Sequence, residues 1–166
     1  MKRTNILFPD IITLLNLVCG FLSLYFASLG LFFHASILIL CGVFFDFMDG
    51  KFARWLKIKS DLGKNLDSLS DLVSFGVAPA FLLILFFNGS LFLIISSILL
   101  VVAGAYRLAR FNVINQKGFI GMPITVNGVI IPVLIILGLN NEYIYSAILL
   151  VSAFLMVSKI RIPKMA

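Results

Sequence analysis

Charged residues are scarce in this sequence. Asp, Glu, Lys and Arg together make up 12% of its 166 residues, whereas apolar residues make up 61%. A soluble domain carries about 25% charged residues, enough to cover its surface with polar groups. The composition therefore excludes an ordinary soluble domain and predicts a polytopic membrane protein.

Cysteine and histidine are also rare, which excludes further classes of protein. Cys19 and Cys41 lie inside apolar stretches and lack the paired spacing of a zinc site or a disulfide scaffold, and His34 is the single histidine. The basic N-terminus has no small-residue cleavage site before the first long apolar run. We interpret that run as an uncleaved membrane span rather than a signal peptide.

Six apolar segments are long enough to cross a bilayer as helices. They cover roughly residues 11–31, 34–56, 66–88, 91–112, 122–139 and 143–160. The breaks between them are short and contain turn residues, so no soluble domain fits between the spans. We expect an all-α fold in which residues 1–166 form a single transmembrane domain.

The thirteen basic residues predict the orientation of these spans. They precede the first span, flank the second and fourth connections, and follow the sixth span. With six spans, every Lys and Arg falls on one side, which is then cytoplasmic, so both termini face the cytoplasm from the cell membrane. Basic residues beside apolar spans, rather than on one amphipathic face, also speak against nucleic-acid binding.

Acidic residues are concentrated in one stretch, Asp46 to Asp71, which contains five of the seven in the chain. Asp46 and Asp49 share one helical face, and Asp67 and Asp71 share a face of the next helix. A turn near residues 58–62 would fold these helices antiparallel, so that four carboxylates converge. Oxygen ligands without His or Cys suit Mg²⁺ or Mn²⁺.

Two other interpretations of the acidic stretch remain open at this point. The acids could simply pair with neighbouring Lys and Arg residues in a solvated loop. Alternatively, intramembrane acids could serve a cation transporter or a proton relay. A transporter needs a polar path across the bilayer, and apolar runs such as residues 81–87 offer none. This favours an interfacial active site reached from one side.

The stretch resembles the signature of the CDP-alcohol phosphotransferases, D-x2-D-G-x2-A-R-x8-G-x3-D-x3-D. Every fixed position is present: Asp46, Asp49, Gly50, Ala53, Arg54, Gly63, Asp67 and Asp71. The predicted six-span, cytoplasm-facing layout is similar to that family as well, so the resemblance covers essentially the whole chain.

The resemblance implies a phosphatidyl transfer from a CDP-linked lipid, CDP-diacylglycerol or CDP-archaeol, to an alcohol, with release of CMP. It also implies two divalent cations. By position, Asp46 and Asp67 would bridge both cations, Asp49 would complete one and Asp71 the other. Asp71 would also be the general base for the acceptor hydroxyl. A homodimer is a further implication of the family.

The same resemblance points to residues that bind the CDP-lipid. These CDP-lipid-binding residues are Asp10, Thr13, Gly50, Arg54, Ser60 and Gly63. Residues 9–13 are similar to a P-N-x-x-T pattern of relatives, but Asp10 stands where Asn is frequent. A plain N-cap of the first helix is the alternative for this residue.

Segments 105–112 and 119–125 resemble the phosphatidylserine synthase branch of the family, which implies L-serine as acceptor. Arg107 or Arg110 would bind its carboxylate, with Asn112 and Thr125 supplying oxygen atoms. Alternatively, an arginine at this position would serve only the positive-inside rule of membrane topology and bind no substrate. Glycerol-3-phosphate and inositol phosphate, which other branches use, are the rival acceptors.

Overall fold

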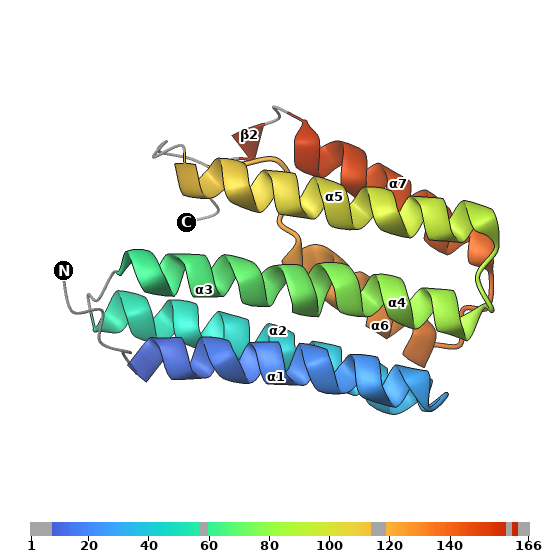
Figure 1. Ribbon diagram of the computed structural model, residues 1–166, viewed down its shortest axis with the longest axis horizontal. Coiled ribbons are helices and arrows are strands. Elements are labelled where there is room, and N and C mark those ends of the chain that lie inside the picture. Colours follow the sequence, from blue (N-terminus) through green and yellow to red (C-terminus); the bar gives the residue numbers. More distant parts are fainter. Residues whose placement is uncertain (1–7, 57–59, 114–118, 159–160, 163–166) are drawn as a thin grey trace.

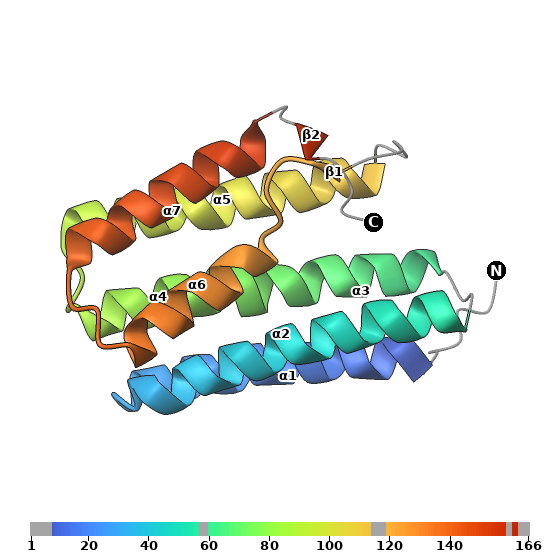
Figure 2. The same ribbon diagram turned by 180° about the vertical axis from the view of Figure 1, so that it is seen from behind.

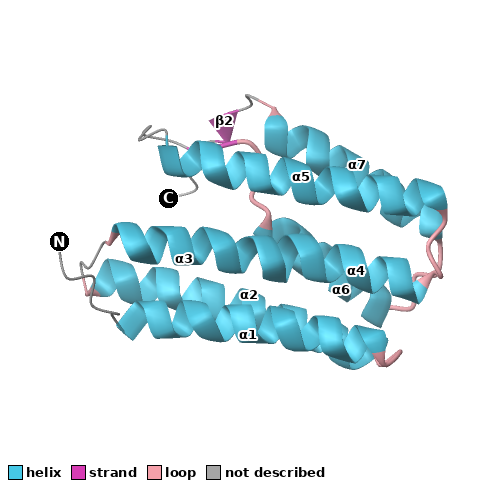
Figure 3. Cartoon of the chain, in the orientation of Figure 1, coloured by secondary structure: helices cyan, strands magenta, loops and turns pink. Residues whose placement is uncertain are grey.

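The computed structural model describes residues 8–56, 60–113, 119–158 and 161–162. Helices account for nearly all of this part of the chain (Figure 3). They are α1 (Phe8–Ser28), α2 (Phe32–Trp55), α3 (Asp61–Asp71), the π-helix η1 (Leu72–Val77), α4 (Ala78–Phe86), α5 (Leu91–Val113), α6 (Thr125–Ile136) and α7 (Glu142–Val157). The strands β1 (Phe119–Ile120) and β2 (Arg161–Ile162) form one short antiparallel pair. The prediction of an all-α fold is confirmed.

The helices form a bundle of two adjoining groups (Figures 1 and 2). In one group, α1 packs along α2, and both contact the rod formed by α3, η1 and α4. In the other group, α5 packs along α7. Helix α6 packs mainly against α2 and η1, and it is seen in front of α4 when the molecule is viewed from behind (Figure 2). The rod therefore connects the two groups.

Sharp turns join the helices at the end of the bundle remote from the N-terminus. Gly30 and Gly138 adopt positive φ angles of 74° and 77°, and Asn88 one of 51°. Glycine takes these angles without strain, which is why the chain reverses there in a few residues. At the opposite end, Ser60 caps α3 by accepting a hydrogen bond from the Gly63 amide at 2.9 Å.

Four helical segments of the described chain are long and apolar enough to cross a membrane: Pro9–Ser28, Phe32–Trp55, Asp61–Phe86 and Leu91–Val113. Helices α6 and α7 are apolar but shorter. Large apolar side chains such as Phe21, Phe33 and Trp55 are exposed, as expected for surfaces that contact lipid. The protein is membrane-embedded, and the count of six spans stays a prediction.

Two helix boundaries differ from the expected spans for identifiable reasons. The third segment begins at Asp61 rather than near 66, because the Ser60 cap starts the helix before its apolar portion. The fifth segment is helical only over Thr125–Ile136, not 122–139. Gly121 has a φ of 80°, and its backbone lies against the end of α7, so the chain there is not helical.

Candidate active site

Carboxylates from two helices meet where α2 ends and α3 begins. Asp46 and Asp49 of α2 and Asp67 of α3 each offer an oxygen, and these oxygens lie within 4.8 Å of one another. Asp71 lies one turn further along α3, is 8% exposed and interacts directly with Asp46. The structure therefore brings together all four acids that the sequence singled out.

Helix α1 supplies one hydrogen-bond donor to each pair of acids. The Thr13 hydroxyl donates to Asp49 Oδ2 at 2.6 Å, and the Asn16 amide donates to Asp71 Oδ1 at 3.4 Å. Both residues are buried and lie three positions apart, on one face of α1. The acids are thus held between three helices rather than exposed on a loop.

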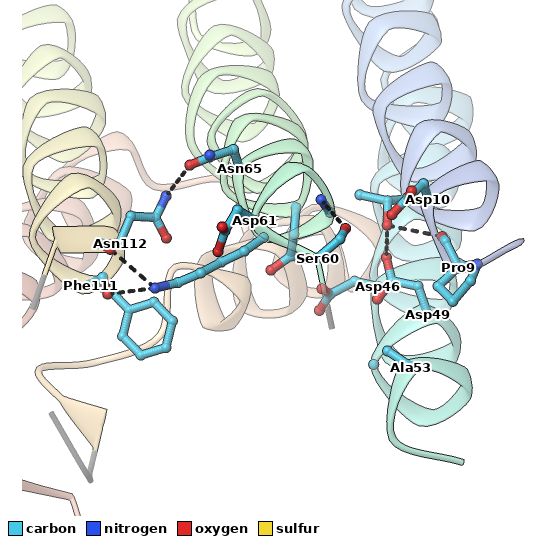
Figure 4. A pocket seen from close by; sticks show the side chains of 15 residues that line it. Pro9, Asp10, Asp46, Asp49, Ala53, Ser60, Asp61, Asn65, Phe111 and Asn112 are labelled. Atoms are coloured by element: carbon cyan, nitrogen blue, oxygen red, sulfur yellow. Dashed lines mark hydrogen bonds between the residues drawn. The ribbon is translucent and has the colours of Figure 1, made fainter. Parts of the chain in front are cut away.

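A cavity of about 790 Å³ opens beside the acids (Figure 4). Its volume is within the usual range for a small-molecule site. It is lined by Pro9, Asp10, Thr13, Asp46, Asp49, Gly50, Ala53, Ser60, Asp61, Gly63, Lys64, Asn65, Asp67, Phe111 and Asn112. Of the predicted site residues, this lining does not include Arg54, Asp71, Arg107, Arg110 or Thr125.

The glycines of the signature have different surroundings. A Cβ built on Gly50 meets nothing within 4 Å, so packing does not require a glycine there and space is left beside the backbone. A Cβ on Gly63 would lie 2.6 Å from Asp10 Oδ1, so this glycine allows α1 and α3 to approach closely. Arg54 is exposed, and its Nε donates to the Gly50 carbonyl at 3.0 Å.

The two arginines predicted to face the acids point in different directions. Arg107 is 7% exposed and interacts electrostatically with Asp71, and its Nε has no hydrogen-bond partner among the described residues. Arg110 instead donates to the Val157 carbonyl of α7 at 3.4 Å. Three residues along a helix leave an offset of about 60°. Because α5 lies between α3 and α7, that offset directs Arg107 toward α3 and Arg110 toward α7.

The remaining acceptor candidates are also placed. Asn112 lines the cavity, and its amide donates to Ser68 Oγ at 3.0 Å and to Asn65 Oδ1 at 3.2 Å. Thr125 is the first residue of α6 and is half-buried. The structure therefore brings Arg107 and Asn112 to α3, but it gives Arg110 and Thr125 no place in the cavity lining.

Sequence reasoning missed Asn16 and Lys64. The Lys64 ammonium donates to the carbonyls of Phe111 and Asn112, both at 3.2 Å, and so ties the start of α3 to the end of α5. A helix end presents unpaired carbonyls, which a lysine from another element can satisfy. The available signal for Asn16 was its spacing of three from Thr13 in an otherwise apolar span.

The acid cluster fits divalent metal ions. Among the described residues no Lys or Arg forms an ion pair with Asp46, Asp49 or Asp67, which speaks against the salt-bridged loop. Carboxylates this close repel one another unless a cation lies between them. The available ligands are all oxygens, the set that Mg²⁺ and Mn²⁺ prefer.

A carboxylate cluster beside a cavity, inside a bundle of membrane helices, is compatible with a metal-dependent membrane enzyme that acts on phosphate esters. The model of one such family, CDP-alcohol phosphatidyltransferase, matches residues 6–158. The chain belongs to this family, whose members generally depend on divalent metal ions. The resemblance drawn from the signature is confirmed.

Curated relatives extend this comparison. The chain is 42% identical to CDP-diacylglycerol–serine O-phosphatidyltransferase of Methanocaldococcus jannaschii, over 98% of this chain and 76% of the relative. It is 36% identical to the Bacillus subtilis protein of the same name, over 93% and 89% of the two chains. It is 38% identical to archaetidylserine synthase of Methanothermobacter thermautotrophicus, over 94% and 69%.

Proposed function

We propose that this protein transfers a phosphatidyl group from CDP-diacylglycerol, or its archaeal counterpart CDP-archaeol, to L-serine and releases CMP in phospholipid biosynthesis. The observation that carries the proposal is the cluster of signature carboxylates: Asp46, Asp49 and Asp67 line one cavity, and Asp71 interacts with Asp46 beside it. The names of the relatives, serine O-phosphatidyltransferase and archaetidylserine synthase, support serine as the acceptor.

Asp46, Asp49, Asp67 and Asp71 would hold two divalent cations, Mg²⁺ or Mn²⁺. Bound there, the cations would neutralise the diphosphate of the donor and stabilise the attacking and leaving oxygens. Asp71 takes the proton of the serine hydroxyl. The serine oxygen forms a bond to the lipid-linked phosphorus, the bond from that phosphorus to the CMP oxygen breaks, and CMP leaves with the electron pair.

The donor nucleotide binds on the α1–α3 side of the cavity. Asp10, Thr13, Ser60 and Gly63 line that side, and the open space at Gly50 admits a ligand close to the backbone. Arg54 lies outside the lining, next to Gly50, and would approach a phosphate only from the rim.

The acceptor binds between Asp71 and Arg107. The hydroxyl and the carboxylate of serine are separated by only two carbons, so a base next to a buried cation suits this amino acid. Asn112 of α5 lines the cavity and would offer its side-chain oxygen to the acceptor. Arg110 is a secondary candidate, because its guanidinium donates to the Val157 carbonyl, whereas Arg107 interacts with Asp71. Thr125 is secondary as well, because it does not line the cavity.

The rival acceptors, glycerol-3-phosphate and inositol phosphate, carry a phosphate that favours several cations. Lys64 is the one cationic side chain among the described residues that line the cavity. A cation transporter is disfavoured by the core beyond Asp71, where Phe75, Leu82 and Leu83 are fully buried. These observations support an amino-acid acceptor at a site that is open at one end.

The remaining proposals concern the whole protein. We infer six spans, a single domain over residues 1–166, and a homodimer, the last from family resemblance. The cavity and both termini face the cytoplasm, since the thirteen basic residues fall on that side of a six-span chain.

The acceptor is tested by incubating purified protein with CDP-diacylglycerol, Mn²⁺ and one alcohol at a time. L-Serine, glycerol-3-phosphate and inositol phosphate are compared side by side, and released CMP is measured. We expect CMP with serine. CMP with either rival but not with serine would refute the proposed acceptor and leave the family assignment standing.

A further inference from the structure

Asn16 is completely buried in the middle of α1, a position that an apolar residue would fill at lower cost. Its amide nitrogen donates to Asp71 Oδ1 at 3.4 Å. Its amide oxygen has no hydrogen-bond partner among the described residues. A buried amide with half of its hydrogen-bonding capacity unused costs stability, so its presence calls for an explanation in terms of function.

The main chain of Asn16 makes a second contact with the same region. Its carbonyl accepts a hydrogen bond from Ser74 Oγ at 3.0 Å. Ser74 belongs to the π-helix η1, which begins directly after Asp71. Gly20 lies one turn further along α1, and any side chain there would overlap Ser74. Asn16 thus contacts Asp71 through its side chain and the π-helix through its backbone.

The π-helix makes these contacts consequential. One extra residue per turn rotates a helix relative to its neighbours, and such turns are frequent at functional sites. Here the irregular turn separates the acid-bearing α3 from α4. The orientation of Asp71 therefore depends on how residues 71–74 are attached to α1.

Gly42 of α2 borders the amide oxygen of Asn16. A Cβ at this position would lie 2.8 Å from Asn16 Oδ1, closer than non-bonded atoms approach. The glycine therefore leaves just enough room for the amide. Adding one methyl group to α2 would displace the Asn16 side chain without removing it.

We propose that Asn16 is a positioning residue for Asp71. Its amide holds Oδ1 of the carboxylate, and its backbone anchors the π-helix, so that the second carboxylate oxygen is presented to the reaction. The inference rests on the proposed function, in which Asp71 is a metal ligand and the general base. It adds a residue outside the signature to the machinery of that function.

The test compares Asn16→Leu, which removes the donor at similar volume, with Gly42→Ala, which pushes on the intact amide. Ser23→Ala is the matched control: Ser23 is also fully buried on α1, and its hydroxyl has no partner among the described residues. For each variant, kcat and KM for CMP release are measured at saturating Mn²⁺. The affinity for Mn²⁺ is measured separately, without substrate, by electron paramagnetic resonance of the free ion.

We expect Asn16→Leu to lower kcat and the Mn²⁺ affinity by about 10–100-fold, the usual effect of losing a group that orients a metal ligand. The KM for CDP-diacylglycerol should stay unchanged, because Asn16 does not line the cavity. Gly42→Ala should reduce the same two quantities by a smaller factor, and Ser23→Ala should match the wild type.

A folded Asn16→Leu variant with wild-type kcat and Mn²⁺ affinity would overturn the proposal, and so would equal losses in Ser23→Ala. If Asn16→Leu fails to fold, Gly42→Ala decides, and wild-type values there refute the proposal. If the wild type releases CMP only with an acceptor other than serine, the proposed acceptor is wrong. The variants are then compared with the wild type using that acceptor, so the role of Asn16 is still tested. The Mn²⁺ measurement requires no acceptor at all.

Discussion

At the scale of single residues, the four signature acids occupy unequal positions. Asp46, Asp49 and Asp67 line the cavity, whereas Asp71 lies outside the lining and next to Arg107. Burial between a carboxylate and a guanidinium suits a group that must exchange a proton with one substrate in a dry environment. The neighbouring Arg107 thus separates the proposed base from the purely coordinating acids.

The acid cluster leads to the first prediction. Asp67→Asn should abolish Mn²⁺ binding and CMP release, because the lost carboxylate removes a negative charge that the cation needs. The charge of the bound metal stabilises the transition state by roughly several kcal/mol, which is then lost. Mn²⁺ binding is followed by electron paramagnetic resonance and turnover by CMP release.

Glu142→Gln is the control for this experiment, since Glu142 lies at the N-terminus of α7, at the far end of the bundle from the acids (Figure 1). It removes one negative charge from the protein but should leave both measurements unchanged. Full turnover of Asp67→Asn, or of the wild type in excess EDTA, would contradict a carboxylate-bound metal centre.

The arginines lead to the second prediction. Arg107→Gln should raise the KM for serine strongly, since losing the buried charge partner of a carboxylate costs about 2–5 kcal/mol. Arg110→Gln should change this KM far less, because its guanidinium contacts the Val157 carbonyl rather than the acids. Serine saturation curves at fixed CDP-diacylglycerol provide the measurement.

The opposite ranking of the two arginines would show that the acceptor approaches from the α7 side. In both variants the KM for CDP-diacylglycerol should stay at the wild-type value, since neither arginine belongs to the described lining of the cavity. A parallel rise in that KM would indicate general damage to the site instead.

At the scale of elements, close packing around η1 holds the site in place. Phe75 of η1 is fully buried, and any side chain at Gly128 of α6 would overlap its ring. Ile124, just before α6, is 1% exposed and borders both Gly76 of η1 and Gly104 of α5. Small residues thus let three elements approach closely, as is common between membrane helices.

This packing leads to the third prediction, which contrasts two glycines. Gly128→Ala should destabilise the protein by about 1–3 kcal/mol through overpacking against Phe75. Gly50→Ala should keep wild-type stability, because a methyl group there meets nothing within 4 Å, but it should raise the KM for CDP-diacylglycerol. Thermal unfolding in detergent and donor saturation curves separate the two effects.

The contrast has a clear negative outcome. If Gly50→Ala left the KM for the donor unchanged, the open space beside Gly50 would not be a ligand site. If instead it lowered the unfolding temperature as much as Gly128→Ala, that glycine would serve packing alone.

At the scale of the whole molecule, the polar site lies at one end of an apolar bundle. Asp46, Asp49 and Asp67 line the cavity near the start of α3, while the turns that join α1 to α2, α4 to α5 and α6 to α7 lie at the opposite end of the bundle (Figure 1). Such polarity is expected of an enzyme that takes one substrate from the bilayer and the other from water.

The fourth prediction concerns this polarity. In a Cys19→Ser, Cys41→Ser background, a membrane-impermeant maleimide added to sealed cells should label Asn140→Cys but not Lys117→Cys. The basic side of the chain, which includes Lys117, should face the cytoplasm. Labelling of both positions after the cells are opened is the control. Labelling of Lys117→Cys in sealed cells would refute six spans with cytoplasmic termini.

The sequence alone was sufficient for the class of protein and for selecting four acids that the structure brings together. Scarcity of charge predicts burial in lipid whatever the tertiary arrangement, because transfer of charge into lipid is costly at any position. The signature acids follow helical spacing, so their shared faces are local properties of the chain.

Only the tertiary structure decided how distant residues combine. It separated Arg107 from Arg110, although their spacing predicts similar directions, because each meets a different neighbouring helix. It joined Asn16 to Asp71 across fifty-five positions of sequence, a contact that no local pattern encodes. Local periodicity determines the face on which a side chain lies, whereas its partner depends on which helices pack together.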